Sequence, residues 1–465
     1  MVFTSPTFLF AFLPLVIFLY YISPFKVRNS ILLIASLLFY AWGELTFVLV
    51  LFFSMIVNYI FGRLMTKYSG KKWLLYLGVM LNLSILIFYK YLHFILLTFN
   101  INYTFSESIH LPLGISFFTF QAISYLVDIH RGMAKVQKNV INLGLYISFF
   151  PQLIAGPIVR YNNIAKQLKK RIHSNELFVA GVERFSYGLA KKLIIANAMG
   201  AVADPIFALD SSQISFSLAW LAITCYALQI YFDFSGYSDM AIGLGRMFGF
   251  RFQENFNYPY IATSLKEFWQ RWHISLSRWF RDYLYIPLGG NRNGVLRTYF
   301  NLFLVFILCG LWHGASWNFL LWGLIHGCVL IIEKIGLSQV ILKLPKIFRH
   351  LYTLLIVLVA WVFFRIEDFS LAKDFLARMF YLKKEISYLY DFNYFINNQF
   401  LLTGLFALII ATPVMRKIVT YYPLTSFKGS MKSQLLRAFC IIFLLLISAV
   451  LVSASTYNPF IYFRF

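Results

Sequence analysis

Residues 298–332 read TYFNLFLVFILCGLWHGASWNFLLWGLIHGCVLII, and this stretch decides the fold because it contains no Asp, Glu, Lys or Arg. A segment so apolar belongs in a membrane, where charged side chains are costly. As one straight helix it would be about 50 Å long, well beyond the ~30 Å hydrocarbon core of a bilayer. The stretch therefore has to break, and GASWN at 314–318 is the natural position. We predict a broken membrane hairpin over 298–332.

The rest of the chain shares this apolar character. Of its 465 residues, 60% are hydrophobic, 20% are aromatic and only 13% are charged, far from the composition of soluble proteins. Apolar stretches long enough to cross a bilayer recur from end to end, and the two prolines of FFPQLIAGP favour a re-entrant segment within 140–158. We therefore predict an all-α polytopic membrane protein of about 11–13 membrane segments, some of them re-entrant or broken, without a separate soluble domain.

The charge balance and the cysteines limit the possible ligands. The formal net charge of +23 is expected to lie mainly in cytoplasmic loops, where it contacts anionic membrane lipids rather than nucleic acid. Four cysteines lie in apolar segments without the spacing of a metal site, and we expect free buried thiols, no metal and no bound cofactor. They are Cys225, Cys309, Cys328 and Cys440.

Residues 261–284 predict a single amphipathic helix on the cytoplasmic surface. Its apolar side chains recur at three- and four-residue intervals, and tryptophan beside arginine is typical of a helix that lies flat at a membrane interface. His273 falls on the border of the two faces, either as an interfacial residue or as a titratable group that meets both water and lipid. The apolar face consists of Leu265, Phe268, Trp269, Trp272, Leu276, Trp279, Phe280 and Tyr283.

His313 is the sharpest candidate for chemistry. It lies at the predicted break of the charge-free stretch, in GLWHGASWNF. A membrane-embedded histidine is costly unless it is hydrogen-bonded or lines a cavity, and its ordinary pKa suits a general base in acyl transfer. The alternative is a histidine bound to a backbone carbonyl that holds the break together. His326, in GLIHG, has the pattern of a packing residue or of a residue that supports the site from behind.

Two carboxylates in YFDFSGYSDM form a second group of polar residues in an apolar region. Asp233 and Asp239, with serine and glycine between them, can cap two helices on either side of a break. Alternatively, they form a polar site at a discontinuous membrane helix. Both interpretations predict an interruption near these residues.

Several motifs together resemble the membrane-bound O-acyltransferase family, in particular its bacterial branch that acetylates alginate and peptidoglycan. The resemblance runs through most of the chain, apart from residues 367–400. The motifs are FFPQLIAGPIVRY (149–161), QIYFDFSGYSDMAIGLGRMFGF (229–250), NFNYPYIATSLKEFWQRWHISLSRWFRDYLYIPLGGNR (255–292), LWHGASWNFLLWGLIHG (311–327) and FIYFRF (460–465).

The resemblance implies a fold of many helices around a tunnel through the membrane, by which donor and acceptor approach one point from opposite sides. It also implies that His313 is the catalytic base and that His273 is a second catalytic residue. Further candidates for the substrate path are Asp233, Asp239, Trp312, His326 and Arg271.

The C-terminal hexapeptide FIYFRF, residues 460–465, resembles an aromatic motif of the same bacterial branch. The resemblance suggests that Tyr462 carries the acyl group, since a phenol oxygen can form a labile ester. The alternative role is an interfacial anchor, because tyrosine and phenylalanine favour that level of a membrane.

By resemblance, the chain is expected to move acetyl from acetyl-CoA across a bacterial inner membrane for O-acetylation of a cell-envelope or exported polysaccharide. The resemblance also implies a periplasmic partner similar to serine hydrolases that completes the transfer. Two rival functions stay open from the sequence. One is D-alanyl transfer to teichoic acid, and the other is a transporter without chemistry, which broken helices and a midplane histidine also fit.

Overall fold

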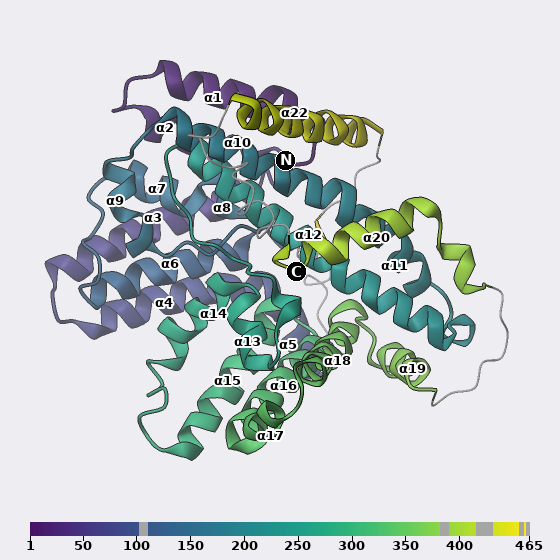
Figure 1. Cartoon of the computed structure of the whole chain (residues 1–465). Helices are drawn as coiled ribbons and strands as arrows, with labels where there is room; N and C mark the ends of the chain where they lie inside the picture. The colour runs from purple at the N-terminus through teal and green to yellow at the C-terminus, as the bar shows by residue number, and fades with distance from the viewer. Residues whose placement is uncertain (102–109, 382–389, 415–430, 455–459, 462–465) are drawn as a thin grey trace. The chain divides into compact units, whose positions relative to one another are not determined.

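The computed structural model describes residues 1–101, 110–381, 390–414, 431–454 and 460–461 (Figure 1). Within these ranges all regular structure is helical, without a β-strand. Seven helices are long and apolar enough to cross a membrane, which confirms the predicted all-helical, multi-pass membrane protein. They are Val48–Lys67, Lys72–Thr98, Phe216–Met247, Val295–His313, Trp317–Lys343, Lys346–Arg365 and Met431–Ala454.

The seven long apolar helices are fewer than the predicted membrane segments. Three apolar helices are shorter, at 10–17 residues: Thr7–Ile22, Arg28–Ala41 and Asn398–Ile410. The helical residues 177–200 include Glu183, Arg184, Lys191 and Lys192, and these four charges distinguish them from the apolar spans. The tunnel and the orientation of each segment stay predictions.

The chain divides into two compact units. Unit 1 comprises residues 1–187, 237–254 and 452–464, and unit 2 comprises 188–236 and 255–451. Three helices contribute residues to both units: α10 (Asn175–Ala190), α12 (Phe216–Met247) and α22 (Met431–Ala454). The other helices of unit 1 are η1 (Thr7–Phe12), α1 (Leu13–Ile22), α2 (Arg28–Ala41), α3 (Val48–Lys67), α4 (Lys72–Leu86), η2 (Ile87–Tyr91), α5 (Leu92–Thr98), α6 (Ile115–His130), α7 (Val140–Ser148), α8 (Phe150–Leu153) and α9 (Tyr161–Lys169).

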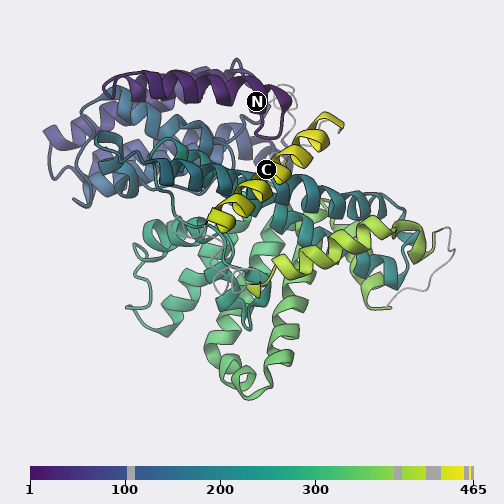
Figure 2. The ribbon, with the colours of Figure 1, turned by 45° about the horizontal axis from the view of Figure 1, so that its top comes forward.

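Polar contacts between apolar helices stabilise unit 1. Helices α3, α4 and α6 lie side by side (Figure 1), and Asn58 of α3 exchanges reciprocal hydrogen bonds of 2.9 and 3.0 Å with Asn82 of α4. Such side-chain pairs satisfy polar groups where no water is available. Near the N-terminus, η1 and α1 form one continuous helix, drawn in purple in Figure 2. The predicted interruption at FFPQLIAGP lies between α7 and α8, where Phe149 leaves the helical conformation.

Unit 2 contains the hairpin that the sequence predicts from the charge-free stretch. Helix α15 (Val295–His313) ends at His313, and α16 (Trp317–Ile332) begins after Gly314–Ser316. The two helices approach closely because Gly310 and Gly323 carry no Cβ; a methyl group at either position would overlap a backbone carbonyl of the other helix, that of Phe319 or Phe306. The hairpin therefore packs backbone against backbone just below its turn.

Unit 2 contains further helices besides this hairpin. They are η4 (Lys191–Ala196), α11 (Asn197–Phe207), η5 (Ser211–Gln213), η6 (Pro259–Ile261), α13 (Leu265–Arg271), α14 (Ile274–Phe280), η7 (Arg281–Tyr285), η8 (Glu333–Leu337), α17 (Ser338–Lys343), α18 (Lys346–Arg365), α19 (Phe369–Met379), η9 (Phe392–Phe395) and α20 (Asn398–Ile410).

The prediction of one amphipathic helix over 261–284 is wrong. The segment forms η6, α13, α14 and η7, with an interruption at Trp272 and His273, and the φ angle of His273 is +42°. Its apolar side chains pack inside the protein: Trp272 is 1% exposed and His273 is fully buried. The spacing of the apolar residues fits one helix, but the tertiary contacts formed at the interruption outweigh this local preference for a continuous helix.

The predicted interruption near Asp233 and Asp239 is also absent, because α12 is one helix of 32 residues. The glycine between the carboxylates serves close packing instead of a break. A Cβ at Gly236 would lie 2.8 Å from the backbone oxygen of Gly188. Glycine at this position of α12 therefore allows α12 to pack closely against the end of α10.

Candidate functional site

The candidate site is built around the interruption between α13 and α14. Two backbone hydrogen bonds pair this interruption with an earlier strand-like stretch: Asn257 N–H donates to the Arg271 carbonyl at 2.9 Å, and Ile274 N–H donates to the Asn255 carbonyl at 2.9 Å. Asn255 also accepts from the Ser275 N–H at 3.1 Å through its side chain. Asn255 thereby satisfies two amide groups at the start of α14, which an isolated helix would leave without acceptors.

These contacts determine which nitrogen of His273 carries the proton. The side-chain oxygen Oδ1 of Asn255 accepts hydrogen bonds from the backbone N–H of Ser275 and, at 2.8 Å, from the Ser275 hydroxyl. The Asn255 atom that faces His273 is therefore an acceptor. The Nδ1 atom of His273 lies 3.3 Å from this oxygen and is therefore the donor. Burial lowers the pKa of His273 to about 3, which keeps the ring neutral. The lone pair is left on Nε2, which is buried without a hydrogen-bond partner among the described residues.

His313 lies close to His273 although the two are far apart in the chain. Their ring centroids are 6.5 Å apart, and Trp312 contacts both rings. The His313 side chain is 1% exposed and is enclosed by Trp322 and Phe364 at centroid distances of 5.0 and 5.2 Å. The structure thus brings the two predicted catalytic histidines together in unit 2 within a wall of aromatic rings.

His326 packs against Trp322 and also has a defined proton. Its ring is 4.8 Å from that of Trp322, and its Nδ1 accepts a hydrogen bond of 3.3 Å from the indole N–H of Trp269. Because an indole nitrogen only donates, His326 is neutral with its proton on Nε2. That Nε2–H and the indole N–H of Trp322 are two buried donors for which the described residues provide no acceptor.

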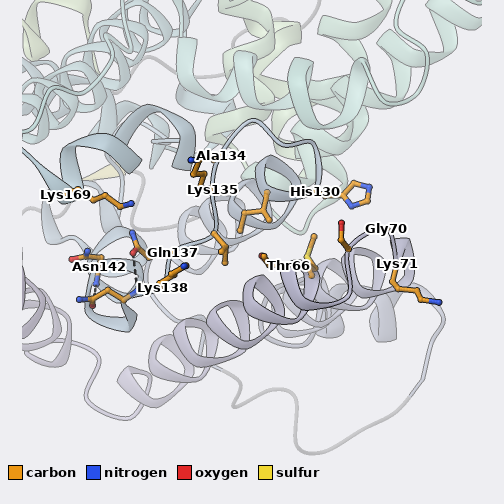
Figure 3. A pocket seen from close by; sticks show the side chains of 15 residues that line it. Thr66, Gly70, Lys71, His130, Ala134, Lys135, Gln137, Lys138, Asn142 and Lys169 are labelled. Carbon is orange, nitrogen blue, oxygen red and sulfur yellow. Dashed lines mark hydrogen bonds between the residues drawn. The ribbon is translucent and has the colours of Figure 1, made fainter.

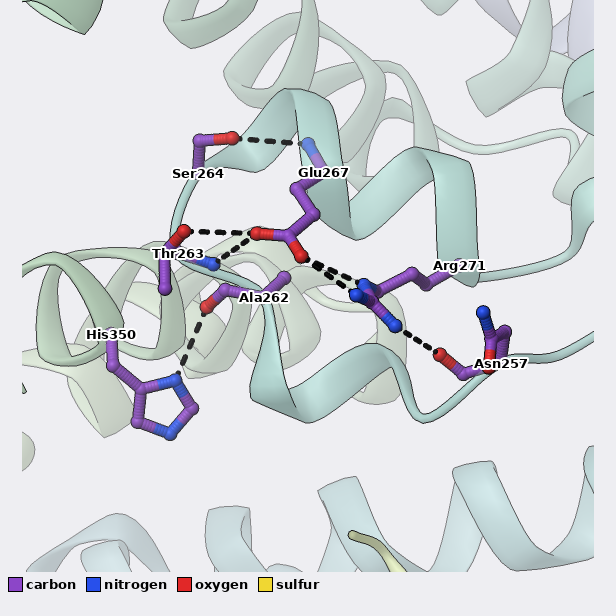
Figure 4. A network of polar contacts seen from close by, with 7 residues as sticks. All are labelled: Asn257, Ala262, Thr263, Ser264, Glu267, Arg271 and His350. Carbon is purple, nitrogen blue, oxygen red and sulfur yellow. Dashed lines mark hydrogen bonds and ion pairs between the residues drawn. The ribbon is translucent and has the colours of Figure 1, made fainter. Parts of the chain in front are cut away.

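A polar network fixes α13, which carries Trp269 into the site (Figure 4). Ser264 caps the helix by accepting from the Glu267 N–H, and Glu267 accepts from the N–H and hydroxyl of Thr263 at 2.8 and 2.9 Å. Arg271 binds Glu267 at 2.9 Å and the Asn257 carbonyl at 3.0 Å. The buried carboxylate of Glu333 accepts from the first N–H of the helix, that of Leu265, at 2.7 Å. The negative charge of Glu333 at the N-terminus of α13 also interacts favourably with the helix dipole.

The other predicted site residues have mainly structural contacts. Arg271 belongs to the network that joins α13 to the stretch at Asn257. Asp233 forms a buried ion pair of 2.5 Å with Lys192 in unit 2. Asp239 pairs with Arg184 at 2.7 Å in unit 1. The two carboxylates therefore neutralise separate cations rather than forming one polar site. Tyr462 lies outside the described residues.

Sequence reasoning missed several residues of the site. Asn255 precedes His273 by many residues, and only the backbone pairing of their two segments brings them together. Trp322 and Phe364 sit in apolar helices where an aromatic residue gives no functional signal. In the described ranges, no group of three His, Cys, Asp or Glu side chains could hold a metal ion.

Comparisons with known proteins agree on one family. The model of the MBOAT, membrane-bound O-acyltransferase family matches residues 95–371, a range that includes both histidines. A probable alginate O-acetylase AlgI of Pseudomonas putida is 40% identical over 500 residues, covering 100% of both chains. Its counterpart in Azotobacter vinelandii is 44% identical over 392 residues, 82% of this chain and 78% of its own. A peptidoglycan O-acetyltransferase of Helicobacter pylori is 39% identical over 423 residues, covering 82% and 80%.

Proposed function

Because the chain belongs to the membrane-bound O-acyltransferase family, and is thereby a multi-pass membrane acyltransferase, we propose that it O-acetylates a cell-envelope or exported polysaccharide. The donor in this proposal is cytoplasmic acetyl-CoA, and the membrane is the bacterial inner membrane. An alginate-like glycan or peptidoglycan is the acceptor class that the names of the relatives support. A periplasmic partner similar to serine hydrolases would complete the transfer.

The observation that carries the proposal is the pair of buried, neighbouring histidines, His273 and His313. In the proposed step, His313 removes the proton of an attacking hydroxyl group as its oxygen bonds to the acetyl carbonyl carbon. The carbon–sulfur bond of the thioester then breaks, and the CoA thiolate leaves and takes up the proton from His313, which returns to its neutral form. His273 supports this step as a neutral ring whose Nε2 lone pair can accept a hydrogen bond from the reacting group.

Two donors can stabilise the negative oxygen of the tetrahedral intermediate. These are the indole N–H of Trp322 and the Nε2–H of His326, which the described residues leave without acceptors. Donors that are already oriented in a dry site lower the barrier more than donors in water. In this proposal Trp322→Phe, which keeps an aromatic ring and removes the N–H, lowers kcat by about a hundredfold to a thousandfold.

The fate of the acetyl group is tested by intact-mass measurement of the purified protein after incubation with acetyl-CoA. Wild type is compared with His313→Ala, Tyr462→Phe and the control His110→Ala, an exposed histidine that pairs with Glu44 in unit 1. An acetyl adduct on Tyr462 that requires His313 supports the base and the acyl relay together. Turnover without an adduct supports direct transfer and leaves Tyr462 an anchor. Full turnover in His313→Ala would refute the proposed base.

A further inference from the structure

Unit 1 contains a wide pocket whose lining residues are distant in sequence from His273, His313 and His326. It has a volume of about 1000 Å³ and is formed by the end of α3, the end of α6, the loop at 134–139 and the end of α9. Figure 3 shows Lys138, Lys169, Gln137 and Asn142 gathered at one end of it, and His130 and Lys71 at the other. The volume is ample for a small-molecule ligand.

The charge of the pocket wall has one sign. Four of the lining residues are lysines, Lys71, Lys135, Lys138 and Lys169, and none of the lining residues is Asp or Glu. In the part of the chain that the structure describes, none of the four ammonium groups forms an ion pair or a side-chain hydrogen bond. The four lysines are exposed to solvent and have the same sign of charge, so together they raise the local concentration of anionic ligands.

Neutral contacts hold the wall of the pocket in place. Gln137 is buried: its backbone N–H donates to the Tyr125 hydroxyl at 3.3 Å and its side chain donates to the Tyr161 hydroxyl at 3.4 Å. The Asn142 side chain accepts from Asn29 at 2.7 Å. The acid on α6, Asp128, is buried and accepts from the Asn162 N–H at 3.2 Å. The lysines therefore project from a fixed frame whose carboxylate is already bound elsewhere.

We propose that this pocket binds a phosphate-bearing ligand. A cluster of point charges on long side chains suits phosphate, which lysine recognises by charge rather than by a planar fork. The positive-inside rule assigns these basic loops to the cytoplasmic side, where nucleotide phosphates and anionic lipid headgroups are both present. The shared chemistry is the phosphate group, whose source is either a soluble nucleotide or a phospholipid. This proposal does not depend on the proposed acetyl transfer.

The test uses the full chain in nanodiscs of zwitterionic lipid. Adenosine 3′,5′-bisphosphate is titrated against wild type and against the fourfold variant Lys71→Ala, Lys135→Ala, Lys138→Ala, Lys169→Ala. A matched control replaces four exposed lysines elsewhere, Lys343, Lys346, Lys373 and Lys432, with alanine. A second arm adds phosphatidylglycerol and counts the lipid molecules retained by each protein in native mass spectrometry. A third arm titrates a polyuronate oligosaccharide, which carries carboxylates and no phosphate.

The expected result is that the pocket variant binds one of the two phosphate probes at least about tenfold more weakly than wild type, whereas the control does not. The affinity should also fall as salt is added, since exposed charges are screened. Loss of nucleotide binding identifies a soluble ligand, and loss of retained lipid identifies a headgroup site. Equal binding of both phosphate probes by variant and wild type would overturn the proposal. So would a variant that loses affinity only for the polyuronate.

Discussion

Replacement of Asn255 by alanine tests whether this side chain prepares His273 for the reaction. In the wild type, Asn255 Oδ1 lies 3.3 Å from His273 Nδ1 and holds the proton there, so that the lone pair is on Nε2. A hydrogen bond of this kind contributes about 0.5–1.5 kcal/mol. Its loss would shift the equilibrium constant between the two tautomers about 2- to 13-fold toward the Nε2–H form, and we expect kcat to fall about twofold or more while KM changes little.

The assay measures release of free CoA and acetylation of the polysaccharide by purified variants. The matched control is Asn301→Ala, because Asn301 is also fully buried in unit 2 and donates to the backbone carbonyls of Leu288 and Gly290. Both replacements remove buried hydrogen bonds, so both should lower the free energy of unfolding by about 1–3 kcal/mol. Only Asn255→Ala changes the surroundings of His273.

Two results would refute this reasoning about Asn255. One is a kcat for Asn255→Ala equal to that of Asn301→Ala at similar thermal stability, which would mean that the tautomer of His273 does not matter. The other is a loss of activity in Asn255→Ala that is recovered when the protein is stabilised, for example at lower temperature. The proton position itself can be followed by the ¹⁵N chemical shifts of labelled His273, which should differ between wild type and Asn255→Ala.

Three further predictions concern stability and are measured by thermal unfolding in detergent. Burial lowers the pKa of His273 from about 6.5 in the unfolded chain to about 3 in the folded protein. The unfolded chain therefore binds the proton first, and stability should fall as the pH drops below about 6.5, by up to about 1.4 kcal/mol per pH unit. His273→Gln should reduce this slope, and an unchanged slope contradicts the burial argument. Asp233→Asn should cost about 3–5 kcal/mol because it removes the carboxylate bound to Lys192, and the double replacement Lys192→Met, Asp233→Leu should recover most of that loss. Gly310→Ala should cost about 1–3 kcal/mol, whereas Gly404→Ala, with open space around it, should be neutral or stabilising.

The sequence predicts the features of this fold that depend on local composition. The absence of charge over 298–332 requires a break, and α15 and α16 end and begin at Gly314–Ser316. The prolines of FFPQLIAGP similarly locate the end of α7. The assignment of His313 and His273 as a catalytic pair came from the resemblance to a family and not from spacing, since forty positions of chain separate them.

Features that depend on tertiary contacts were not predictable. The periodicity of 261–284 is that of one helix, yet the segment breaks at His273 because Asn255 satisfies the amide groups that the break exposes. Conversely, the serine and glycine residues around Gly236 look like a helix break, yet α12 continues because the glycine allows close packing. In both cases the deciding partner comes from another segment, and a local pattern contains no information about it.

The aromatic surroundings of the histidines have a chemical consequence for the proposed transfer. His313 contacts Trp312, Trp322 and Phe364, side chains that exclude water and offer few competing acceptors. An acetyl thioester in water loses its acyl group to hydrolysis, whereas in a dry site the substrate hydroxyl is the available nucleophile. A dry site also requires that its imidazoles stay neutral and that each proton is held at a defined atom. The contact of His273 with Asn255 and that of His326 with Trp269 meet this requirement, one by leaving an acceptor at Nε2 and the other by leaving a donor.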